Sequence, residues 1–159
     1  MFKDNRWLEP LQPEDGAPDQ FDWPHPQPFL RALTVTDEHI DEIGHTNNVI
    51  YLHWLQQLGW AHSASLGLDW NAYAKLGYAM VAAHHSLNYH ADTRPGDRLL
   101  LATWHASGDG RLRMRRGYQI VRLRDRKTVL TGYTDWISVR LASGKPARMP
   151  AEFATAYKV

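Results

Sequence analysis

The sequence predicts an α+β domain that combines one long helix with an antiparallel sheet of about five strands. Three features of the chain predict it: an apolar strand-like segment near residue 30, one helical stretch from about Asn47 to Leu66, and a succession of strand-like segments after residue 78. Strands and helices do not alternate, which disfavours a doubly wound parallel sheet. We expect the sheet to wrap around the helix, because each can then bury one face.

The first strand and the long helix follow from residue spacing. Phe29–Val35 is rich in apolar and β-branched residues and is predicted to be a strand. After a turn-like segment, Ile50, Trp54 and Leu58 recur at helical spacing on one face. Gly67 lies where a left-handed residue would end the helix.

The rest of the chain is predicted to be a set of consecutive strands joined by turns. The predicted strands are Tyr78–Tyr89, Arg98–Ala106, Arg111–Arg124 and Val129–Leu141. The segments between them are rich in Gly, Pro, Asp and Ser, as turns require: Arg94–Asp97, Ser107–Gly110 and Asp125–Lys127. Short turns between neighbouring strands favour antiparallel pairing.

Composition bounds the possible functions. The chain has 159 residues, of which 43% are hydrophobic and 22% charged, as in one ordinary globular domain. It contains no cysteine, which excludes disulfides, thiolate metal sites and thiol nucleophiles. No apolar run is long enough for a membrane span and no signal sequence is evident, so we expect a cytoplasmic protein that does not bind membranes. A net charge of only +1 does not indicate a nucleic-acid partner.

Residues 1–28 differ from the remainder and are predicted to be an extended arm preceding a domain at 29–159. They hold six of the nine prolines and a net charge of −4, whereas the remaining residues carry +5. Proline removes the backbone donors that helices and central strands need. The aromatic residues Phe2, Trp7, Phe21 and Trp23 indicate that the arm packs on the domain or on a partner subunit.

The segment Asp41–Tyr51 concentrates residues suited to chemistry just before the long helix. It reads Asp-x-x-Gly-His-x-Asn-Asn-x-x-Tyr. Amide N–H groups at a helix start can stabilise an oxyanion, while Asp41 could attack a carbonyl or align water and His45 could move a proton. Asp and Asn also cap helices and glycine turns corners, so a purely structural role stays open.

This string resembles the signature of hotdog-fold acyl-CoA thioesterases of the 4-hydroxybenzoyl-CoA thioesterase type. The resemblance covers about residues 29–150 and extends to Leu66-Gly67-Leu68, Leu87-Asn88-Tyr89, Arg94-Pro95-Gly96-Asp97 and Trp136-Ile137-Ser138-Val139. It implies a hotdog fold, a homodimer or homotetramer with active sites at the subunit interface, an acyl-CoA or acyl-carrier-protein substrate, and no cofactor or metal.

The resemblance also implies residue roles. Asp41 matches the nucleophile or general base, His45 the motif histidine, and the amides near Asn48 the donors to the thioester oxygen. The neighbouring motif residues assigned to substrate binding are Gly44, Asn47 and Tyr51. Two departures leave Asp41 as the main carboxylate. Related plant enzymes have Asn where this chain has Ile43, and other hotdog thioesterases use a helical glutamate where it has Gln56 and Gln57.

The remaining histidines and the basic segment have simpler interpretations. The spacing of His39, His45, His84, His85 and His90 matches no ligand set, so no metal site is expected. Eight bases fall in the segment 111–127: Arg111, Arg113, Arg115, Arg116, Arg122, Arg124, Arg126 and Lys127. A solvated sheet face is the first interpretation, because Arg111, Arg113 and Arg115 alternate with apolar residues. Contact with coenzyme A phosphates is the second.

The sequence therefore predicts a thioester hydrolase acting on acyl-CoA. A hotdog hydratase or dehydratase, a non-catalytic acyl-thioester binder and a basic nucleic-acid or partner-binding module stay open as alternatives. The sequence indicates neither the acyl group nor whether Asp41 acts as nucleophile or as base.

Overall fold

The structure is a computed structural model that describes residues 6–158. Its strands are β1 Phe29–Thr34, β2 Tyr78–Tyr89, β3 Arg98–Gly108, β4 Arg113–Arg122 and β5 Lys127–Arg140. Its helices are α1 Asn48–Ser65, α2 Trp70–Leu76 and α3 Ala151–Ala156, with 3-10 turns η1 Pro13–Asp15, η2 Pro18–Gln20 and η3 Asp37–His39. The five strands and the long helix confirm the predicted elements to within a few residues, whereas α2 and α3 were not predicted.

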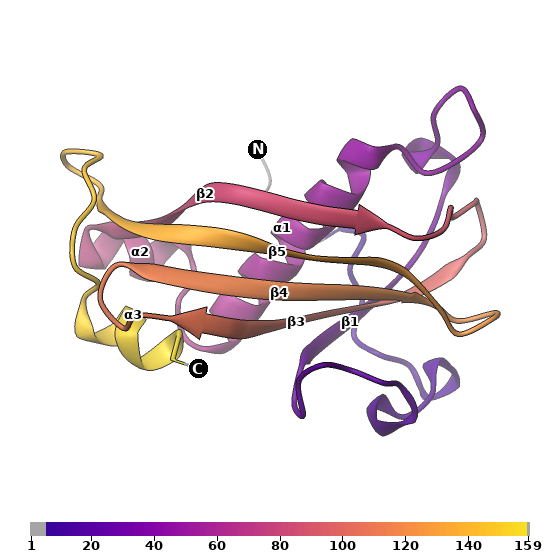
Figure 1. The fold of residues 1–159 in the computed structure, drawn as a ribbon, viewed down its shortest axis with the longest axis horizontal. Coiled ribbons are helices and arrows are strands. Elements are labelled where there is room, and N and C mark those ends of the chain that lie inside the picture. Colours follow the sequence, from indigo (N-terminus) through magenta and orange to yellow (C-terminus); the bar gives the residue numbers. More distant parts are fainter. Residues whose placement is uncertain (1–5, 159) are drawn as a thin grey trace. The chain divides into compact units, whose positions relative to one another are not determined.

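The strands form one five-stranded sheet in the order β1-β3-β4-β5-β2 (Figure 1). β1 pairs antiparallel with β3, in a register that sets Phe29 opposite Thr103 and Thr34 opposite Arg98. β2 lies at the other edge, beside β5. This arrangement confirms the α+β class and the five-stranded antiparallel sheet. Within residues 6–158, no helix is long and apolar enough to cross a membrane; the cytoplasmic location stays a prediction.

The chain divides into two compact units, and α1 and the four long strands contribute to both. Unit 1 comprises Met1–Gly59, Leu87–Trp104 and Tyr118–Thr131. Unit 2 comprises Trp60–Ser86, His105–Gly117 and Gly132–Val159. In unit 1, Trp54, Leu55 and Leu58 of α1 pack against buried sheet residues such as Leu99 and Ile120. Burial of this apolar surface is the main stabilising contribution in that unit.

Unit 2 has a separate core built around aromatic residues of its short helices. Tyr73 of α2, Phe153 of α3 and Tyr157 pack together with Met80 and Met114 of the sheet. Helix α2 begins where the Asp69 carboxylate accepts a hydrogen bond from the amide of Ala72, and it ends at Gly77 in the left-handed region. These are ordinary start and stop signals of a helix.

The described part of the N-terminal arm belongs to unit 1 and contains the 3-10 turns η1 and η2. Glu9 bridges to Ala32 of β1, and Leu8 joins the core. The Trp7 ring contacts His39 and His53 edge-on. The described part of the arm therefore packs on the protein, whereas Phe2 lies outside the described residues; a boundary at residue 28 stays a prediction.

Candidate active site

A tight turn before α1 presents the motif histidine. The amide of Asp41 donates to the carbonyl of His45, and the amide of Gly44 donates back to the carbonyl of Asp41, both over 3.0 Å. Gly44 adopts φ +83°, a conformation that residues with a Cβ rarely take. The glycine of the motif is thus required by the turn, and His45 is held at the turn's end.

The Asp41 side chain takes part in the same turn. Its Oδ1 accepts a hydrogen bond from the amide of Ile43 over 3.0 Å. This is the local side chain-to-backbone bond by which aspartate stabilises turns. The structural role considered from the sequence is therefore present, and any catalytic role of Asp41 must come from its remaining lone pairs.

The two asparagines of the motif have different roles at the start of α1. Asn47 caps α1, because its Oδ1 accepts from the amide of Val49 over 2.9 Å. Asn48 is exposed, and its carbonyl accepts from the Tyr89 hydroxyl over 3.1 Å. The amides of Thr46 and Ile50 also donate within the protein, to Thr93 and Asn47. Among the described residues, the Asn48 amide is the one at this helix start left for a ligand oxygen.

Tyr51 lies in the core rather than at the surface of the site. Only 3% of the residue is exposed, and its hydroxyl lies 2.8 Å from Oγ1 of Thr93. Burial raises the pKa of this hydroxyl. Thr93 also bonds to Oγ1 of Thr46, over 2.6 Å. The motif tyrosine therefore anchors the segment around Thr93 beside the turn that carries His45.

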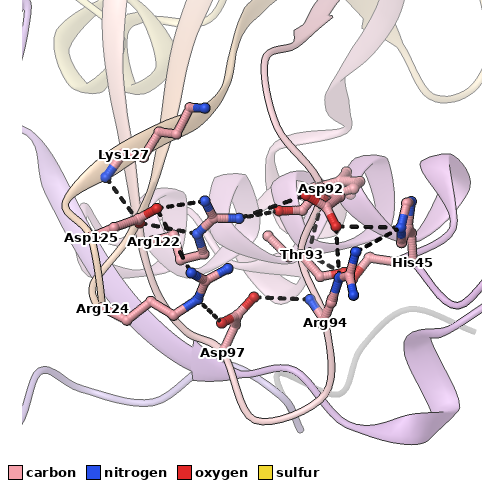
Figure 2. Close-up of polar contacts among 11 residues, drawn as sticks. His45, Asp92, Thr93, Arg94, Asp97, Arg122, Arg124, Asp125 and Lys127 are labelled. Atoms are coloured by element: carbon pink, nitrogen blue, oxygen red, sulfur yellow. Dashed lines mark hydrogen bonds and ion pairs between the residues drawn. The ribbon is translucent and has the colours of Figure 1, made fainter.

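Asp92 and Arg94 complete the surroundings of His45, and sequence reasoning did not assign either to the site. His45 Nε2 lies 3.3 Å from Oδ2 of Asp92 and 3.4 Å from Nη2 of Arg94 (Figure 2). Arg94 Nε donates to the same Asp92 oxygen over 2.9 Å. The His45 side chain is 38% exposed. The imidazole can therefore reach water or a bound ligand.

A buried arginine, Arg122, supports the segment that carries Asp92. Arg122, whose side chain is only 6% exposed, donates to the carbonyl of Asp92 and pairs with the carboxylate of Asp125. That pairing lowers the pKa of Asp125 to about 2. The hydrogen bond from Arg94 holds the pKa of Asp92 below its usual range, so this carboxylate is an anion at neutral pH.

The basic segment is a solvated face only in part: Arg111 and Arg113 are exposed, as predicted, but two other arginines correct the first interpretation. Arg116 and Arg122 are buried, where they bind partners inside the protein. Arg115 pairs with Asp135 over 2.7 Å, and Arg124 pairs with Asp97 over 2.7 Å. Coenzyme A phosphates cannot reach buried Arg116 and Arg122, so phosphate contact is wrong for these two residues.

Two of the other candidate histidines, His85 and His90, bond to hydroxyl groups. His85 Nδ1 lies 2.8 Å from Oγ1 of Thr134, and His90 Nε2 lies 2.7 Å from Oγ1 of Thr131. Within residues 6–158, no three His, Asp or Glu side chains are placed to hold a metal ion.

The site thus combines an accessible imidazole, an ionised carboxylate and a helix-start amide. Two exposed apolar side chains lie on the same stretch of chain: Ile43, 76% exposed, and Val49, 72% exposed. Such a combination can bind an apolar group, polarise a carbonyl and move a proton.

Comparisons with known proteins agree with this fold. A 1,4-dihydroxy-2-naphthoyl-CoA thioesterase from Synechocystis is 22% identical, with 82% of this chain and 96% of that chain covered and a TM-score of 0.71. A DHNA-CoA thioesterase from Staphylococcus aureus is 20% identical, with 82% and 88% covered and a TM-score of 0.74. A hypothetical protein from Staphylococcus aureus, solved in complex with CoA, is 19% identical, with 82% and 81% covered and a TM-score of 0.76.

The family model gives the same result from sequence. The model of the thioesterase-like superfamily matches residues 35–157. This range contains the turn of His45, the loop of Asp92 and every strand except β1. With its five-stranded sheet and single long helix, the chain has the hotdog fold and belongs to the thioesterase-like superfamily.

Proposed function

We propose that the protein hydrolyses the thioester bond of an acyl-coenzyme A. The observation that carries the proposal is the accessible His45, held beside Asp92 and immediately before the open N-terminus of α1. Membership of the thioesterase-like superfamily supports this reaction class. A CoA complex of a Staphylococcus aureus protein with the same fold supports coenzyme A as the thiol carrier.

The proposed reaction uses two kinds of group in the protein: a hydrogen-bond donor to the thioester oxygen and a proton acceptor for water. The thioester oxygen accepts a hydrogen bond from the Asn48 amide, which makes the carbonyl carbon more electrophilic. A water molecule attacks that carbon as Asp41 or His45 takes its proton, and a C–O bond forms. Collapse of the intermediate breaks the C–S bond, and the proton passes to the leaving sulfur. The products are a carboxylic acid and free coenzyme A.

We propose a homodimer, or a pair of dimers, as the active form. Edge strand β2 supports this, because its residues 81–85 are all exposed although they alternate between the two faces of the sheet. An edge strand with open backbone groups is a ready site for pairing with another strand. Light scattering tests the proposal, since a stable and active monomer at micromolar concentration would contradict it.

The decisive experiment is a panel of acyl-CoAs and acyl-carrier-protein substrates, with thiol release followed by a chromogenic disulfide. The chain has no cysteine, so the protein itself contributes no signal. We expect turnover of at least one class, and loss of that turnover in His45→Gln. Binding of acyl-CoA without thiol release would favour a non-catalytic binder instead. Hydration of enoyl-CoA, read in the ultraviolet, would favour a hydratase.

A further inference from the structure

We infer that Asp92 is the positioning carboxylate of His45: it binds the Nε2 side of the ring so that Nδ1 can accept a proton from the attacking water. The inference rests on the proposed function and assigns the proton acceptor within it. Two unlike groups, the Asp92 carboxylate and the Arg94 guanidinium, lie beside the Nε2 nitrogen of His45.

His45 Nε2 faces one hydrogen-bond acceptor and one donor at nearly equal distances. Oδ2 of Asp92 is 3.3 Å away and Nη2 of Arg94 is 3.4 Å away (Figure 2). With a proton on Nε2, the ring donates to Asp92; without one, it accepts from Arg94. The ionised carboxylate favours the first state, because a charged acceptor makes the stronger hydrogen bond.

Asp92 is fixed well enough to orient a ring. Arg94 Nε holds its Oδ2 over 2.9 Å, and Arg122 holds its backbone carbonyl. The next residue, Thr93, is completely buried and bonds to Thr46 and Tyr51. The segment that carries Asp92 is therefore tied directly to the residue that follows His45 and to α1.

The two carboxylates near His45 then have separate tasks. Asp41 shapes the turn through its bond to the amide of Ile43. Asp92 contacts the ring itself. In the neutral ring, a proton on Nε2 leaves a lone pair on Nδ1, which takes a proton from water as the water oxygen bonds to the thioester carbon. The imidazolium is stabilised by Asp92 and returns the Nδ1 proton to the sulfur as the C–S bond breaks.

Kinetics of Asp92 variants test this assignment. Asp92→Asn keeps the shape but removes the charge, so we expect kcat to fall at least ~10-fold, with KM changed less than about 3-fold, as for loss of a transition-state interaction. Asp92→Glu should recover most of the lost kcat, because it restores a carboxylate. The control is Asp135→Asn, which removes a carboxylate that pairs with Arg115 in unit 2. Asp135→Asn should retain kcat.

A second readout does not depend on turnover. Nitrogen-15 NMR at pH 9, where an imidazole is neutral, reports which ring nitrogen carries the proton, and His45→Gln identifies the signals of His45. We expect the proton on Nε2 in the parent protein. In Asp92→Ala, Arg94 is left facing Nε2, so the proton should move to Nδ1.

The outcomes separate the inference from the proposed function. If the parent releases thiol and Asp92→Asn retains its kcat, the inference is overturned and the thioesterase activity stands. If no substrate is hydrolysed, the proposed function fails, and the NMR measurement decides alone. A tautomer that does not change in Asp92→Ala would overturn the inference, whereas a shift to Nδ1 would support it.

Discussion

The two ends of α1 use the same residue types for opposite purposes. Just before the first residue of α1, Nε2 of His45 lies 3.3 Å from Oδ2 of Asp92 and 3.4 Å from Nη2 of Arg94. The Arg94 side chain is 62% exposed. In the last turns of α1, Nδ1 of His62 lies 2.8 Å from Nη1 of Arg116 on β4. Arg116 is only 2% exposed. We call the first, solvent-exposed arrangement the wet end of α1 and the second, largely buried arrangement the dry network.

The dry network connects several buried and half-buried side chains of unit 2 through hydrogen bonds. Arg116 also lies 3.2 Å from Nε2 of His105 and 3.5 Å from Oγ of Ser63. Tyr157 donates to Ser63 over 3.0 Å. Two imidazoles that accept bonds from a guanidinium must keep those nitrogens free of protons. An arginine beside a histidine therefore does not by itself indicate a proton-transfer site; access to water and an adjacent carboxylate do.

The largest effect is expected when the dry network is broken. Arg116→Met fills similar space but removes the donor to His62, His105 and Ser63. Each buried acceptor that loses its donor costs ~1–3 kcal/mol, so we expect the free energy of unfolding to fall by about 3 kcal/mol. Urea denaturation followed by circular dichroism measures it.

Arg115→Met is the matched control for that experiment. The Arg115 side chain is 40% exposed and pairs with Asp135, and exposed ion pairs contribute little to stability. The unfolding midpoint should hardly move in this variant. An equal loss in both variants would show that positive charge on β4, and not the buried network, stabilises unit 2.

The next effect concerns Asp41, at the wet end. Asparagine keeps the turn bond to Ile43 but is neither basic nor nucleophilic. If Asp41 supplies the attacking electrons, contrary to the assignment of His45 as the base, Asp41→Asn should lower turnover at least ~100-fold while stability stays the same. Steady-state thiol release and urea denaturation measure the two quantities. Turnover within a few-fold of the parent would limit Asp41 to the turn and leave His45 as the base.

Much of the fold could be predicted because its signals are local. Apolar spacing marks α1, and turn residues separate the strands. Helix α2 was missed although its signals are present, since Asp69 and Gly77 cap only seven residues. Alternation along β4 places Arg116 on the face of buried Met114, opposite Arg115. The burial of Arg116 could therefore have been expected, but its histidine partners are far away in sequence.

The candidate site could be predicted only in part, for the same reason. The Asp41–Tyr51 string is contiguous, so it is visible in the sequence. Asp92 lies far along the chain from His45 and reaches it only because Thr93 is held by Thr46 and Tyr51. No local pattern encodes that contact, and a sequence reader sees in Asp92–Asp97 only a turn.

A smaller effect is expected from pH acting on a buried histidine near the wet end. Burial lowers the pKa of His39, which lies between the rings of Trp7 and Trp54. The unfolded chain then binds more protons below about pH 6.5, so stability is lost as the pH falls through that value. His39→Asn should reduce the loss between pH 7.5 and 5.5 by about 1 kcal/mol. Urea denaturation at both pH values tests it, and an unchanged loss would assign the effect elsewhere.

The smallest change compares one glycine at each end of α1. Gly44 has φ +83° and Gly67 has φ +82°, and a Cβ added at either position would meet no atom within 4 Å. Alanine at either site should therefore cost the same, about 1 kcal/mol of backbone strain. Only Gly44 belongs to the turn that holds His45, so only Gly44→Ala should also lower kcat, whereas Gly67→Ala should lose stability alone. Gly44→Asn should lose less of both, since asparagine tolerates the left-handed region. Equal losses of kcat in the two alanine variants would mean that turnover follows overall stability and not the geometry of the turn before α1.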